Sequence, residues 1–209
     1  MEHFSATVIL VIITCIISYQ AFNQPHLIER YKHYPVREAG MGEFYRLLSA
    51  GFLHGGWLHL LINMFVLWMF GEIVENMYKV LFGNTLGVIL YVVMYLSCIA
   101  VANVGTFFKH RNNPSFASIG ASGAVSGVVF IYILADPWAL LYLYGLIPIP
   151  GIIAGVLFLW YSSWAGKRGG DLIDHDAHYY GAVYGVAFTI LLNPGMLWLF
   201  FENLFAGIN

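Results

Sequence analysis

The chain has 209 residues, of which 60% are hydrophobic and only 10% are charged, and its formal net charge is −2. A soluble domain carries roughly 25% charged residues, so this composition excludes an ordinary soluble protein and requires lipid around much of the surface. No basic run is present, so we expect no nucleic-acid partner, and the length allows one membrane domain, residues 1–209.

Six apolar runs approach the length of about 20 residues that a membrane-spanning helix needs. They cover residues 4–21, 57–78, 80–104, 121–135, 149–164 and 176–193. The first run has no Lys or Arg before it, so we expect a retained span and not a signal peptide. Because only helices pair every backbone polar group of such runs inside hydrocarbon, the sequence predicts an all-α, multi-pass membrane protein with a bundle of six transmembrane helices in a lipid bilayer.

The segments between the spans differ in character. Residues 23–56 are too long for a turn and too rich in Phe, Leu and Tyr for a disordered linker, so we expect a large folded loop at the membrane surface. Residues 136–150 contain three prolines, which favours an extended interfacial stretch over a helix. The apolar tail after Pro194 is predicted to be an interfacial helix.

The fourth span is short. It begins near Ser122 and ends before Asp136-Pro137, so its roughly 14 residues reach about 21 Å across a hydrocarbon core of about 30 Å. The segment before it must therefore enter the membrane, where irregular backbone is tolerated only if protein or a watered cavity covers it. We expect Gly120, Ser122 and Gly123 at the floor of a polar cavity.

Polar residues inside apolar spans are costly and suggest function. His59 and Asn63 of the second span are four residues apart, so they share one helix face, and His54 precedes them near the interface. In the sixth span, Gly181 and Gly185 follow His178, and this spacing lets another helix backbone approach closely.

Ser122 begins a helix within the run Gly120-Ala121-Ser122-Gly123. The free N–H groups and the dipole of a helix N-terminus favour an anion. An acyl-transfer nucleophile needs that setting for its oxyanion and also needs a base, for which His178 is the candidate. Each feature alone is explained by small or polar contacts between helices, whereas their combination points to catalysis.

Together these motifs resemble those of the rhomboid intramembrane serine proteases. The resemblance extends over nearly the whole chain, with the three main motifs in order on spans two, four and six. The residues that carry it are His54 to Asn63, Gly120 to Gly123, Ala177 to Gly181 with Gly185, Tyr45-Arg46, and Gly71 with Glu75.

The resemblance implies an intramembrane serine endopeptidase that cleaves transmembrane segments of single-span membrane proteins with a Ser-His dyad. Ser122 would attack the peptide carbonyl, and His178 would act as general base and then as acid. The Ser122 backbone N–H, His59 and Asn63 would form the oxyanion hole. His54 would support that region, and no metal or organic cofactor is implied.

Three features depart from the family pattern or leave alternatives. The position four residues after the serine, often aromatic in the family, is Ser126, so we expect another ring, Tyr179 or Tyr180, to orient His178, or else a looser dyad. Tyr45 stands where Trp is usual. Asp174 and Asp176 lie near His178, but helix capping and a solvated loop explain them better than a catalytic triad.

The sequence is also compatible with two functions other than serine proteolysis. A non-catalytic rhomboid-like protein would bind membrane clients, although such relatives typically lack the serine or the histidine. A metal-dependent membrane hydrolase would use ligands from His54, His59, His175, His178, Asp174 and Asp176, although no HExxH motif occurs. Rhomboids place the first loop outside the cytoplasm, and we expect that orientation although the basic residues on that face favour the reverse.

Overall fold

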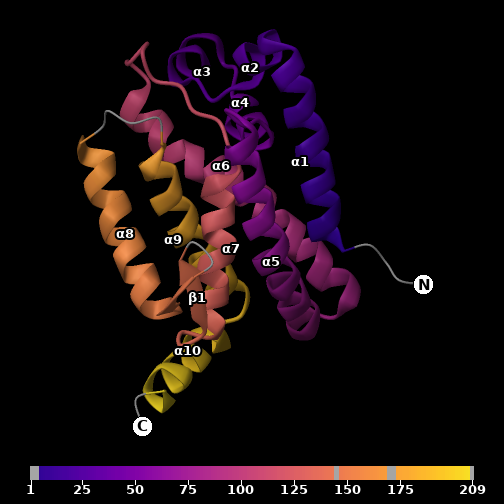
Figure 1. Ribbon diagram of the computed structural model, residues 1–209, viewed down its shortest axis with the longest axis vertical. Helices are drawn as coiled ribbons and strands as arrows, with labels where there is room; N and C mark the ends of the chain where they lie inside the picture. The colour runs from indigo at the N-terminus through magenta and orange to yellow at the C-terminus, as the bar shows by residue number, and fades with distance from the viewer. Residues whose placement is uncertain (1–4, 144–145, 169–172, 208–209) are drawn as a thin grey trace.

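The computed structural model describes residues 5–143, 146–168 and 173–207. A helix occupies each of the six predicted ranges, as Figure 1 shows. These helices are α1 (Ala6–Asn23), α5 (Trp57–Phe82), α6 (Asn84–His110), α7 (Ser122–Ala135), α8 (Gly151–Arg168) and α9 (His175–Leu192). The described part of the chain is therefore mostly helical, as its apolar composition requires.

Three of these helices, α1, α5 and α6, are by themselves long and apolar enough to cross a membrane. Helix α9 meets that criterion together with α10 (Gly195–Ala206), but the pair is bent by 113°. Helix α7 is a shorter apolar helix of 14 residues with the predicted bounds. The described residues thus contain three or four candidate spans, and the count of six stays a prediction.

The segment between α1 and α5 is folded. It contains α2 (Pro25–Tyr31), α3 (Pro35–Met41), α4 (Arg46–Ser49) and the 3₁₀ helix η1 (Ala50–Phe52). Pro25 and Pro35 begin their helices, where a missing N–H costs nothing and the fixed φ is already helical. We call residues 24–56 loop one; in Figure 1 its short helices gather at the end of the molecule opposite α10.

The described residues within 136–150 form no helix, as predicted. They contain two strands, β1 (Leu140–Leu143) and β2 (Ile147–Pro150), which pair antiparallel with Leu141 opposite Ile149. Helix α10 follows Pro194, also as predicted. It is attached to the end of α7, because Asn203 Nδ2 donates to the carbonyl of Ala135 at 2.9 Å.

Helix α7 lies inside the bundle, in contact with α5, α6 and α9 (Figure 1). Its backbone touches that of α9. A Cβ on Gly181 would overlap the carbonyl oxygen of Gly123, and one on Gly185 would lie 2.7 Å from the carbonyl oxygen of Gly127. The close approach predicted from Gly181 and Gly185 is confirmed, and glycines of α7 provide its other side.

Gly71 and Glu75, which carry part of the resemblance, connect α5 to α1. Glu75 is buried and accepts hydrogen bonds from the backbone N–H and the hydroxyl of Thr7, at 2.8 and 3.0 Å. Lys79 pairs with the other carboxylate oxygen at 2.7 Å. A Cβ on Gly71 would lie 2.7 Å from the Thr7 methyl group, so this glycine lets α1 approach.

The glycine contact gives a test of the packing. In Gly181→Ala the new methyl group has no room, because rigid backbone and not a movable side chain faces it. We expect a loss of at least about 2 kcal/mol in stability, as overpacked cores show. Gly40→Ala is the control, since nothing lies within 4 Å of that Cβ. Thermal unfolding in detergent measures both, and equal melting temperatures would contradict the packing described here.

Candidate active site

Ser122 and His178 meet where α7 and α9 begin. Ser122 is the first residue of α7, and His178 is on the first turn of α9. The Oγ of Ser122 lies 2.7 Å from Nε2 of His178, within hydrogen-bond distance. The glycine contact between the two helices sets this separation. The pair has the geometry of a nucleophile and its base.

The backbone before Ser122 turns sharply beside His59. Gly120 has a φ of 133°, which side chains rarely tolerate, and a Cβ there would lie 2.8 Å from Cε1 of His59. The first N–H groups of a helix have no partner inside it, so those at the start of α7 are available to a ligand. The site therefore combines free donors, a positive dipole end and the His59 ring.

His59 and Asn63 lie on one face of α5, as their spacing predicted. Asn63 is buried, and its Nδ2 donates to the carbonyl of His59 at 2.9 Å. Asn63 shares a cavity with Ser122 and His178. His59 reaches the same region from the Gly120 side. The structure thus brings both predicted donors close to Ser122 by different routes.

His54 is fully buried and its ring packs edge-on against that of His59, with centroids 4.9 Å apart. Its Nδ1 lies 2.9 Å from the hydroxyl of Ser18, which donates to the carbonyl of Phe52. Burial, with a smaller effect of His59, lowers the pKa of His54 from 6.5 to about 3. A neutral His54 therefore supports the His59 ring from loop one.

The ring stacked on His178 is Phe158 of α8, at a centroid distance of 5.9 Å and an angle of 24°. We expected the ring of Tyr179 or Tyr180 to orient His178, and for the described contacts this is wrong, because those two rings pack against each other. Tyr179 and Tyr180 are one and two positions after His178 on the helix, so their side chains point to other sides. Ser126 instead donates to the carbonyl of Ser122 at 2.8 Å.

Both nearby carboxylates have other partners. Asp174 caps α9 by accepting from the N–H of Ala177 at 2.9 Å, as predicted, and it also accepts from Thr106. Asp176 forms an ion pair with Lys109, whose ammonium group also donates to the carbonyl of Gly166 at 2.6 Å. Asp174 and Asp176 thus connect α9 to α6 and α8.

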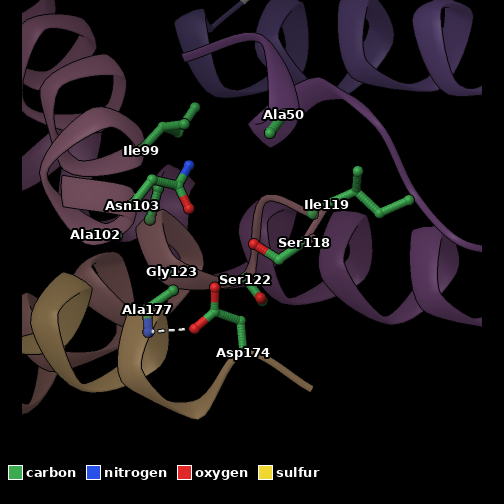
Figure 2. A pocket seen from close by; sticks show the side chains of 12 residues that line it. Ala50, Ile99, Ala102, Asn103, Ser118, Ile119, Ser122, Gly123, Asp174 and Ala177 are labelled. Atoms are coloured by element: carbon green, nitrogen blue, oxygen red, sulfur yellow. Dashed lines mark hydrogen bonds between the residues drawn. The ribbon is translucent and has the colours of Figure 1, made fainter. Parts of the chain in front are cut away.

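Two cavities border Ser122. A small one of about 10 Å³ includes Gly120, Gly123, Asn103, Ser118 and Asp174 in its wall (Figure 2). Gly120, Ser122 and Gly123 all line this one cavity. That they form the floor of a polar cavity within the membrane stays a prediction. The larger cavity, of about 260 Å³, is mainly apolar and was not foreseen. It lies between α5, α7 and α8, and contains Ser122 and His178 in its wall.

Within the described ranges, no group of three or more His, Cys, Asp or Glu side chains is arranged to hold a metal ion. The rings of His175 and His178 lie 5.9 Å apart, but the six residues considered as metal ligands do not converge on one point there. Sequence reasoning missed Phe158 and Lys109, because one apolar ring and one lysine carry no motif.

These features define a helical membrane protein with a serine–histidine pair beside a helix N-terminus. The sequence model of the Rhomboid domain matches residues 41–195, and the chain belongs to the rhomboid family. It is an integral, multi-pass membrane protein, in agreement with its long apolar helices.

Two curated relatives are similar to this chain. "RHOMBOID-like protein 12, mitochondrial" of Arabidopsis thaliana is 24% identical over 173 residues, which are 79% of this chain and 51% of that protein. "Putative rhomboid protease YdcA" of Bacillus subtilis (strain 168) is 29% identical over 92 residues, 44% of this chain and 41% of that protein. The matched part of the chain thus spans about half, or less, of the length of each relative.

The pKa of His54 predicts an acid-sensitive fold. Below pH 6.5 the unfolded chain binds a proton at His54, whereas the folded chain does so only near pH 3, so acid favours unfolding. At pH 5 this proton binding lowers the free energy of unfolding by up to about 2 kcal/mol. We expect His54→Gln to show a smaller fall in melting temperature between pH 7 and pH 5 than the parent protein. Identical pH dependence in the two proteins would refute this assignment.

Proposed function

We propose that this chain is an intramembrane serine endopeptidase that cleaves transmembrane segments of single-span membrane proteins with a Ser122–His178 dyad. The observation that carries the proposal is the 2.7 Å separation of Ser122 Oγ and His178 Nε2 at the edge of an apolar cavity. Membership of the rhomboid family supports the same activity. In this proposal α8, α9 and α7 together with the segment before it cross the membrane, beside α1, α5 and α6.

The residues suggest how the reaction proceeds. His178 Nε2 accepts the proton of Ser122 as Oγ attacks the scissile carbonyl, and His178 then gives that proton to the leaving amine. The oxyanion forms beside the N–H of Ser122, with His59 and Asn63 as further donors. A water molecule activated by His178 then hydrolyses the ester. No metal or organic cofactor takes part.

The surroundings fit a substrate that arrives from lipid. The 260 Å³ cavity has apolar walls on α5, α7 and α8, so it suits an apolar side chain next to the scissile bond. Phe158 limits the rotation of the His178 ring by stacking on it. A non-catalytic client-binding relative would not need this hydrogen-bonded pair, and no observation favours a metal-dependent hydrolase.

The proposal requires both members of the dyad. Ser122→Ala removes the nucleophile and His178→Ala removes the base, so each should lower cleavage by at least about 1,000-fold. The assay is cleavage of a generic single-span substrate by purified protein in liposomes, with thermal unfolding as the check on folding. Cleavage retained by purified Ser122→Ala would rule the mechanism out.

The carboxylates should be dispensable for the chemistry. Asp174→Asn keeps a good cap for α9, and Asp176→Asn removes only the ion pair with Lys109. We expect both variants to keep cleavage within about fivefold of the parent protein, whereas loss of a true triad carboxylate costs about 10,000-fold. A loss near that size at unchanged melting temperature would replace the dyad by a triad.

A further inference from the structure

Loop one holds the backbone that precedes the nucleophile. His33 and Ser118 exchange two backbone hydrogen bonds, each of 3.0 Å. Two residues further on, the N–H of Gly120 donates to the carbonyl of Ala50 at 3.0 Å. Three bonds from loop one therefore fix residues 118–120, immediately before α7. Among the described residues, these are the backbone hydrogen bonds that residues 118–120 make.

The His33 side chain is itself fixed on two sides. It is fully buried, and its Nδ1 lies 2.7 Å from Oε1 of the equally buried Glu38. The same carboxylate oxygen accepts from the N–H of Tyr34 at 2.9 Å. The ring of Phe116 packs edge-on against His33, with centroids 6.2 Å apart. Glu38 thus determines the position of His33 through both its side chain and the backbone next to it.

The buried His33–Glu38 pair is an unfavourable way to stabilise the fold. Oε2 of Glu38 and Nε2 of His33 are buried and have no hydrogen-bond partner within the described chain. Unpaired buried polar atoms destabilise a fold, and apolar side chains often replace a buried ionisable pair without loss of stability. The pair is therefore better explained by the position that it imposes on its neighbours.

We propose that His33 and Glu38 are positioning residues for the oxyanion hole. They hold residues 116–120 so that Gly120 lies against His59 and the N–H of Ser122 faces the reacting carbonyl. Neither residue touches the substrate or the dyad, so they act only through the backbone. This inference rests on the function proposed above.

The His33–Glu38 pair acts on the backbone before Ser122, so its loss should change kcat more than KM. A shift of residues 118–120 displaces the Ser122 N–H, and misplacement of a catalytic group by about 1 Å can cost about 100-fold in rate. The apolar cavity beside the dyad is lined by α5, α7, α8, α9 and β1 and not by residues 118–120, so the binding of substrate side chains should not change. Loss of the pair should therefore lower kcat and leave KM nearly unchanged.

The first test compares two substitutions of one residue. Glu38→Ala removes the acceptor for both His33 and Tyr34, and we expect kcat to fall about 10- to 100-fold with KM within about threefold. Glu38→Gln keeps an oxygen in that place and should retain most of kcat. Glu43→Ala is the matched control, because Glu43 is also a carboxylate of loop one and pairs with Arg37 and Arg46. An equal fall in kcat in Glu43→Ala would overturn the assignment.

The second test separates position from stability. The double variant His33→Phe/Glu38→Leu fills the site with apolar atoms, so we expect a melting temperature at or above that of the parent protein and a kcat that stays low. Parent-like kcat in this folded variant would overturn the proposal. Ser122→Ala is assayed in parallel: if it still cleaves substrate, the proposed function itself fails, whereas parent-like kcat in Glu38→Ala beside an inactive Ser122→Ala rejects only the positioning role.

Discussion

The backbone contact between α7 and α9 is the constraint on which the site depends. Between two helices in lipid there is no hydrophobic driving force, so close van der Waals packing has to hold them together. Gly123 and Gly127 face Gly181 and Gly185 without any Cβ between the backbones. Because Ser122 and His178 lie beside these glycines at the starts of their helices, the same contact brings Oγ and Nε2 within hydrogen-bond distance.

The parts of the fold that follow from local chemistry were predictable. The bounds of α7 could be predicted from Pro137 and from Gly120 before Ser122, and the cap of α9 from Asp174. Polar residues inside apolar runs identified the dyad candidates. The ring that stacks on His178 could not be predicted from the sequence, because Phe158 lies on another helix and its contact with His178 depends on how α8 packs. Tyr179 and Tyr180 were near in sequence but face other sides of α9.

Loop one shows the same limit at longer range. Its ion pair between Glu43 and Arg46 spans three residues and follows from local spacing. The two hydrogen bonds between His33 and Ser118 join segments that are far apart in the sequence. No residue pattern in either segment predicts these bonds. Their physical role is nevertheless general: irregular backbone beside a membrane-buried site needs protein partners for its polar groups. Loop one provides these partners, and α7 begins at Ser122, two residues after the last of them.

The most direct measurement is covalent labelling of the serine. A fluorophosphonate reacts with a serine that a base has activated, and mass spectrometry identifies the modified residue. We expect a single adduct on Ser122 in the parent protein and a labelling rate at least about 100-fold lower in His178→Ala, because general-base catalysis contributes about 100- to 10,000-fold. An adduct on another residue, or an unchanged rate in folded His178→Ala, would contradict it.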